Sequence, residues 1–259
     1  MPDKSKFMEQ PLLEWPRPLY QPGAHKPFLF YVIFGVDVSA LSISRSKHQC
    51  AGVPEGLSLH SYGPGSNPEV PDQFREGFLW DELRARSPEF AEQVAAQTTC
   101  VIIRGEMEDD ASLDYLRDTI GLITAMLESG GVAVFDSQRF QWWTASAWRD
   151  KVFDAEPADP YAHIVIQTSP ESDGRLWYHT RGMRKFGRPD LSMRGVTPAQ
   201  RNGATEMFNR FIRMQAEGAI IPEGQRISMT GLPDNLYCRH RGHLDDPDFN
   251  NVHVEIGTE

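Results

Sequence analysis

The segment 175–218 constrains the fold of this chain more than any other part of the sequence, because it predicts several consecutive elements. Residues 175–180 are rich in aromatic and β-preferring types and predict a strand that packs against large side chains. A turn bracketed by Gly182 and Gly187 follows, and residues 191–196 resume an extended pattern. The segment therefore predicts two strands joined by a glycine-bracketed turn, and a helix after them.

The helix at the end of this segment has clear start and stop signals. Thr197 offers a hydroxyl at the N-cap, Pro198 suits the first helical position, and Gln200 completes a capping box. Apolar residues then recur at helical spacing, at Met207, Phe208, Phe211 and Met214. Gly218 lies where a left-handed C-cap is expected. The pattern predicts an amphipathic helix with one face against the core.

Basic residues are concentrated in the same segment. Between residues 175 and 194, six basic side chains and one acidic side chain give a local charge of +5, in a chain whose net charge is −10. Such a cluster can hold an anion or contact an acidic partner. In the alternative interpretation, the long aliphatic stems cover a sheet edge. The binding candidates within the cluster are Arg181, Arg184, Lys185 and Arg188.

The residues from His179 to Leu191 follow the spacing Gly-hydrophobic-x-x-Phe-Gly-x-Pro-acidic, which begins at Gly182 and ends at Asp190. This pattern resembles a bacterial domain family to which no function has been assigned. The resemblance covers residues 130–228 approximately and includes the upstream glycine pair and its following apolar run. It implies a bacterial α+β domain, and it implies no activity and no catalytic residues.

The elements along the chain predict an α+β fold with a mixed, largely antiparallel sheet and helices packed on it. Residues 1–27 contain six prolines and predict an extended N-terminal arm, and residues 28–259 are interpreted as a single α+β domain. Residues 28–36 predict the first strand, and residues 48–72 a long loop rich in glycine and proline. The apolar spacing between residues 113 and 127 predicts a long helix preceded by an acidic turn.

Composition excludes several classes of function. A net charge of −10 argues against general binding to nucleic acid or to anionic membranes. The three cysteines lack the paired spacing of a disulfide framework, and the first residues lack the apolar core of a signal peptide, so a cytoplasmic location is expected. The sequence contains no phosphate-binding loop, dinucleotide fingerprint or nucleophile elbow, and no cofactor is expected.

Three weaker patterns are candidates for a site. Trp142 and Trp143 could anchor a partner, although such rings more often fill the space between a helix and a sheet. His179 and Asp190 flank the basic turn and could act as an acid and base pair beside arginines that hold an anion, although His179 alternates with Trp177 and is expected on the same sheet face. The residues Cys238, His240 and His243 form an alternative metal site.

Taken together, these patterns favour a non-enzymatic cytoplasmic bacterial protein that binds a partner protein. One form of this hypothesis is an immunity-type protein that neutralises a basic toxin, since acidic binders complement basic clefts. The alternatives are an enzyme that acts on an anionic small molecule through His179 and Asp190 with the nearby arginines, and a metal-binding protein.

Overall fold

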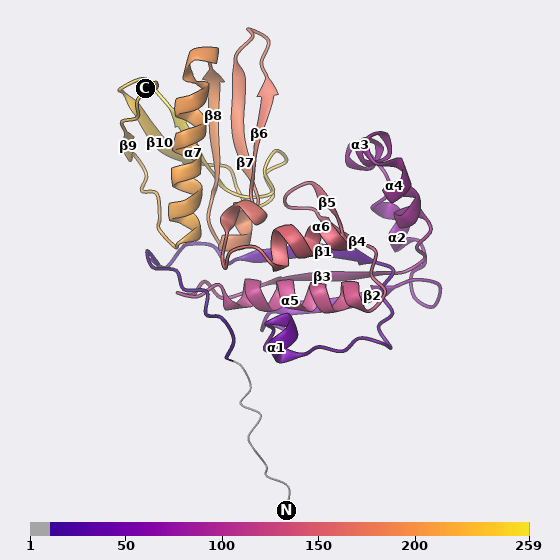
Figure 1. The fold of residues 1–259 in the computed structure, drawn as a ribbon. Helices are drawn as coiled ribbons and strands as arrows, with labels where there is room; N and C mark the ends of the chain where they lie inside the picture. The colour runs from indigo at the N-terminus through magenta and orange to yellow at the C-terminus, as the bar shows by residue number, and fades with distance from the viewer. Residues whose placement is uncertain (1–10, 259) are drawn as a thin grey trace, which may run out of the picture.

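Strand β1 (Phe28–Phe34) is the centre of the first of two β-sheets in the computed structural model, which describes residues 11–258 (Figure 1). Its strand order is β2-β3-β1-β4-β5, and each neighbouring pair is antiparallel. The other strands of this sheet are β2 (Leu57–Tyr62), β3 (Cys100–Glu106), β4 (Ala133–Asp136) and β5 (Gln141–Thr144). As the apolar run predicts, β1 is almost entirely buried.

The second sheet contains the basic segment and has the order β6-β7-β8-β11-β10-β9. Its strands are β6 (Val165–Pro170), β7 (Leu176–Arg181), β8 (Asp190–Val196), β9 (Arg226–Ile227), β10 (Leu236–Arg241) and β11 (His253–Gly257). Strands β8 and β11 are parallel, and the other neighbours are antiparallel. The strands of this sheet cross the direction of the first sheet in Figure 1, and the β6–β7 hairpin extends away from it.

Helices pack on both faces of the first sheet and on the inner face of the second. They are α1 (Arg45–His48), α2 (Val70–Gln73), α3 (Phe78–Arg86), α4 (Pro88–Ala95), α5 (Asp114–Glu128), α6 (Ala145–Trp148) and α7 (Arg201–Ala216). A π-helical turn, Arg149–Phe153, extends α6, and the predicted capping box at Thr197 is present before α7. Every helix within residues 11–258 is too short or too polar to cross a lipid bilayer.

Two apolar clusters hold the helices and the two sheets together. One cluster joins α5, the inner face of the first sheet, the inner face of the second sheet and α7, and Tyr178 of β7 meets Phe208 of α7 edge to face within it. The other cluster lies on the outer face of the first sheet beneath α3 and α4. Among the described elements, no helix covers the outer face of the second sheet, which therefore remains available for a site.

The structure confirms the α+β class and the largely antiparallel pairing. It differs from the expected single sheet, because the strands divide between two sheets whose membership depends on contacts between distant residues. The predicted loop of residues 48–72 also contains a strand, β2. Leu57 and Leu59 alternate with polar residues there, but this pattern is short and is surrounded by glycines and prolines, so it did not predict a strand.

Candidate functional site

The glycine-bracketed turn between β7 and β8 directs part of the basic cluster into the protein. Gly182 and Gly187 have left-handed backbone angles, with φ of 109° and 63°, and Met183–Phe186 forms a 3-10 turn between them. Lys185 and Arg188 are both buried, with exposed fractions of 0% and 2%. The basic cluster is therefore not one continuous cationic surface.

Lys185 joins the two sheets. Its ammonium forms an ion pair with Asp136 at the end of β4, donates a hydrogen bond of 3.1 Å to the carbonyl of His163, and lies 5.2 Å from the ring centre of Tyr31. Burial lowers the pKa of Lys185, and the Asp136 carboxylate opposes that shift. Lys185 was predicted as a binding residue of the basic cluster; this is corrected, because the side chain is fully buried and its charge is paired with Asp136.

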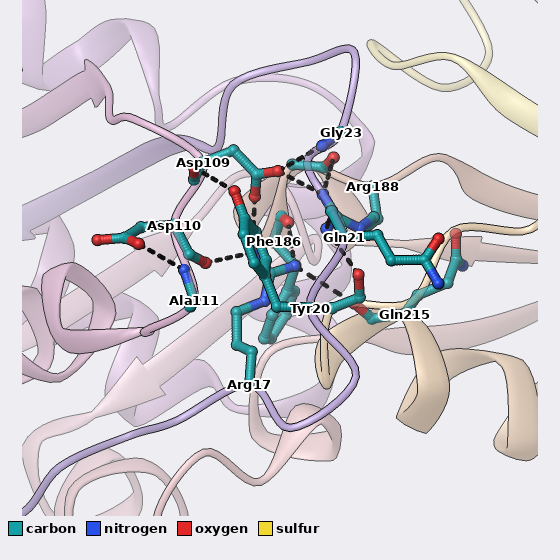
Figure 2. Close-up of polar contacts among 12 residues, drawn as sticks. Arg17, Tyr20, Gln21, Gly23, Asp109, Asp110, Ala111, Phe186, Arg188 and Gln215 are labelled. Atoms are coloured by element: carbon teal, nitrogen blue, oxygen red, sulfur yellow. Dashed lines mark hydrogen bonds and ion pairs between the residues drawn. The ribbon is translucent and has the colours of Figure 1, made fainter.

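Arg188 belongs to a second buried network, in which it shares the carboxylate of Asp109 with Arg17 (Figure 2). The carboxylate accepts from Arg17 at 2.6 Å, from Arg188 at 3.0 Å and from the backbone N–H of Gly23 at 2.7 Å. Arg188 also donates to the carbonyl of Gln21 and to carbonyls just after α7. The network ties the N-terminal segment to the core, so the expected binding role of Arg188 is replaced by a structural one.

Arg184 lies half-buried at the surface. Its guanidinium is 4.5 Å from the ring centre of Phe28 and donates to the carbonyl of Asn250 at 2.8 Å. Glu106 lies 3.9 Å from it, which is a weak ion pair. Arg184 therefore connects β1 to the loop before β11 and remains accessible to a ligand.

The outer face of the second sheet carries a continuous series of stacked side chains. We call it the stacked row, and it consists of Arg194, Trp177, His179, Phe249 and Arg181. Arg194 lies 4.0 Å from the ring centre of Trp177, which stacks on His179 with ring centres 4.1 Å apart. Phe249 meets His179 edge to face and contacts the guanidinium of Arg181. The stacking of Trp177 and His179 confirms that they share one sheet face.

The row ends at a cavity where the two sheets meet, which we call the junction pocket. Its volume is about 450 Å³. Its phenylalanine lining comes from β1 and β4 of the first sheet, from the residue that follows α2 and from two loops, and comprises Phe28, Phe30, Phe74, Phe135, Phe140 and Phe249. The charged side chains in the lining are Arg181, Arg184, Asp190 and Asp245. A cavity that combines apolar rings with a small number of charged and polar side chains is typical of a small-ligand site.

His179 and Asp190 are not hydrogen-bonded to each other. Nε2 of His179 lies 3.1 Å from Oε1 of Gln167, and its Nδ1 is buried without a partner among the described residues. Asp190 accepts from the hydroxyl of Thr180 at 2.8 Å, from a backbone N–H of the turn at 3.3 Å and from Asn251 at 2.8 Å. Asp190 therefore fixes the turn against β8 and the loop before β11, and its oxygens are already used.

Burial shifts both ionisable groups. Desolvation lowers the pKa of His179 to about 4, and the charges of Arg181 and Arg194 contribute to the same shift. Burial raises the pKa of Asp190 to about 6, although its hydrogen-bond donors oppose the change. The folded protein thus favours a neutral imidazole below the pH at which an exposed histidine becomes charged.

This shift predicts a loss of stability in acid. Folding depresses the pKa of His179, so the folded protein keeps its full free energy of unfolding above pH 6.5 and loses part of it as the pH falls toward 4. The raised pKa of Asp190 has the opposite effect, because its carboxyl takes up a proton more readily in the folded protein and so stabilises the fold as the pH falls below 6. We expect His179→Asn to remove about 2–4 kcal/mol of the change in the free energy of unfolding between pH 7 and pH 4. Urea unfolding at pH 7 and at pH 4 measures this change, and His60→Asn, at an exposed histidine, is the control. An equal change in the free energy of unfolding between the two pH values in both variants would contradict the expectation.

Trp142 and Trp143 are buried within the first sheet as residues of β5. Trp142 stacks on Phe135 with ring centres 4.5 Å apart and lies beneath Trp80 of α3. Trp143 faces the opposite side and packs under the guanidinium of Arg139. The structure corrects their predicted role as partner anchors, because both rings fill the space between sheet and helices.

The alternative metal ligands are not brought together. Cys238 is fully buried on the core side of β10, Nε2 of His240 lies 2.8 Å from the carbonyl of Ile221, and His243 is exposed in the following loop. Within residues 11–258, no group of three or more histidine, cysteine, aspartate or glutamate side chains is placed to hold a metal ion.

Several residues of the site were not identified from the sequence. Phe249 lies in an acidic, irregular loop, and Phe140 lies in the short turn between β4 and β5. Asp109 lies in the acidic turn predicted before the long helix, which begins at Asp114, and the sequence did not distinguish it from its acidic neighbours. The one signal in the sequence was a phenylalanine within a polar loop, at Phe249. That signal does not indicate that the ring contacts Arg181.

No family model, curated protein or solved structure shows significant similarity to the chain. The resemblance of residues 130–228 to a bacterial family therefore stays a prediction.

Proposed function

We propose that the protein functions by binding a partner protein, and that the stacked row is part of the surface that contacts it. The observation that carries the proposal is the continuity of the row, from the exposed Arg194 through the half-buried Trp177 to Arg181. Tryptophan and arginine are the side chains that most often supply binding energy at protein interfaces. Stacking fixes their rotamers before binding, which lowers the entropy lost on association.

The charge of the chain supports a partner of a particular kind. A net charge of −10 attracts a basic protein over a distance, whereas the guanidinium groups of Arg181 and Arg194 are suited to carboxylates of that partner at the contact itself. We extend the proposal to an immunity-type neutraliser of a basic toxin in the bacterial cytoplasm. The buried thiols of Cys50, Cys100 and Cys238, none of which forms a disulfide, favour a reducing compartment.

Replacement of Trp177 by alanine is the test of this surface. The tagged full chain would be used to capture proteins from the native host at low salt, and the captured partner would then be purified and titrated by calorimetry. We expect Trp177→Ala to weaken the dissociation constant by about 30-fold or more, because it removes the central ring of the row. Met214→Ala, at an exposed apolar residue of α7, is the matched control and is expected to change it less than about twofold.

Two results would count against the proposal. A partner that binds the Trp177→Ala variant as tightly as the wild type contacts a different surface. The wild type and the Trp177→Ala variant could also capture the same proteins from a host extract in the same amounts. In that case no captured protein depends on the stacked row for binding.

A further inference from the structure

Arg181 differs from the other cations of the basic cluster because its guanidinium has no protein acceptor. Among residues 11–258 it forms no ion pair and no side-chain hydrogen bond, and its Nε is buried without a partner. Arg188, by comparison, donates to four carbonyls and one carboxylate. A partly buried guanidinium without acceptors is costly unless a ligand supplies them.

The orientation of Arg181 is fixed by two aromatic rings. The guanidinium lies 4.9 Å from the ring centre of Phe140 and 5.2 Å from that of Phe249, and all three residues line the junction pocket. Cation–π contacts of this kind hold the guanidinium plane without using its N–H groups. The terminal N–H groups, unlike the buried Nε, therefore remain free for a ligand within the pocket.

Phe140 has a strained backbone. Its φ is 57°, in the left-handed region that a bulky side chain rarely adopts. This conformation occurs in the turn between β4 and β5 and places the ring beside Arg181. Strain of this kind is concentrated at ligand sites, where the surrounding structure maintains a conformation that the chain alone disfavours. It is a second observation, independent of the missing acceptors, that points to this pocket.

The carboxylates near Arg181 do not replace a ligand. Asp190, Asp246 and Asp248 help to keep the guanidinium charged against the effect of burial on its pKa, but none of them forms a hydrogen bond or ion pair with it. Asp190 uses both oxygens for donors within the protein, and Asp246 accepts from two backbone N–H groups of its own loop. The pocket lining also contains Arg184 and Asp245, so its two cations are matched by two carboxylates. A ligand with one negative charge therefore meets less repulsion there than a dianion such as phosphate.

We propose that the junction pocket binds a carboxylate carried on an apolar, preferably aromatic, body. The carboxylate accepts two hydrogen bonds from the Arg181 fork, and the body packs among the phenylalanine rings, in a volume of about 450 Å³ that is adequate for a ligand of this size. The same chemistry occurs in a free aromatic acid and at the carboxyl end of a polypeptide. The inference does not depend on a partner at the stacked row, since a free acid satisfies it alone.

The test compares an acid with its amide on the full chain, by calorimetry. The first pair of probes is N-acetylphenylalanine and its amide. The second is an N-acetylated tetrapeptide of three glycines and a final phenylalanine, with a free or an amidated carboxyl end. We expect the acid of at least one pair to bind the wild type about tenfold or more tightly than the amide, which corresponds to a charge-assisted bidentate contact.

Variants assign this preference to Arg181. In Arg181→Gln the acid and the amide are expected to bind equally, because the charge that distinguishes them is gone. Phe140→Asn, which tolerates the left-handed backbone, is expected to weaken acid and amide alike by about tenfold through loss of a ring. Arg210→Gln, at an exposed arginine of α7 outside the pocket and the stacked row, is the matched control and should retain the full preference for the acid.

Each outcome decides the matter. Equal binding of acid and amide to the wild type, persistence of the preference in Arg181→Gln, or no binding of any probe at about 10 mM would overturn the proposal. Displacement of the acid by inorganic phosphate at similar concentration would also overturn it. If Arg181→Gln does not fold, the comparison of acid with amide on the wild type still stands. Tighter binding of the peptide indicates a polypeptide end as the source, and exclusive binding of the free acid indicates a small molecule.

Discussion

Replacing Lys185 with alanine is expected to lower the free energy of unfolding by about 3–5 kcal/mol, because it leaves the carboxylate of Asp136 buried without its cation. The exposed fraction of Asp136 is 1%, and the hydrogen bond that its side chain retains comes from the backbone N–H of Arg139. The ion pair also joins β4 of the first sheet to the turn before β8 in the second, so its loss weakens the contact between the sheets. Urea unfolding monitored by circular dichroism measures the effect.

Two further variants separate loss of a charge from loss of packing. Lys151→Ala, at an exposed lysine, is expected to change stability by less than about 0.5 kcal/mol. Combining Lys185→Met with Asp136→Asn removes both charges, and this double variant is expected to recover at least half of the stability that Lys185→Ala loses, because no isolated charge remains buried. A Lys185→Ala protein as stable as the wild type would contradict the buried ion pair.

Replacing Asp109 with alanine is expected to have an effect of similar size, about 3–5 kcal/mol, for a related reason. Asp109 is the one carboxylate among residues 11–258 that contacts Arg17 or Arg188, and both guanidinium groups are buried (Figure 2). Without it, two buried positive charges face each other with backbone carbonyls as their acceptors. The midpoint of thermal unfolding is expected to fall by about 10 °C.

The neighbouring residue provides the control for this prediction. Asp110 is exposed, and its side chain accepts from the next backbone N–H, so Asp110→Ala is expected to cost less than about 1 kcal/mol. The carbonyl of Asp110 that accepts from Arg17 is unaffected by this change. In Asp109→Ala, the segment that contains Arg17 and Gly23 is also expected to become more sensitive to limited proteolysis. Equal stabilities of the two variants would contradict the assignment of Asp109 as the shared acceptor.

Much of the local structure was predictable because its causes lie within a few residues. The capping box at Thr197 and the apolar spacing after it predicted α7, and the glycine pair at Gly182 and Gly187 predicted the turn. Alternation along β7 placed Trp177 and His179 on one face, and their rings are stacked there. These signals need no knowledge of distant residues.

The candidate site was less predictable because its partners are distant in sequence. The basic cluster gave four equivalent cations, but Lys185 meets Asp136 from β4 and Arg188 meets Asp109 from the loop before α5. Arg181 is left without a protein acceptor, next to rings that come from two separate loops.

The sequence by itself determined the long helices α5 and α7, the strands β1, β7 and β8, the turn, and the side of β7 that carries Trp177 and His179. The tertiary structure alone decided which cations of the turn became internal ion pairs and which one, Arg181, faces a pocket. The physical reason is that propensity, capping and alternation act over a few residues, whereas the environment of a charge depends on the carboxylates and rings that the folded chain brings to it. The four basic side chains at and beside the turn differ in role only because the folded chain places each of them in a different environment.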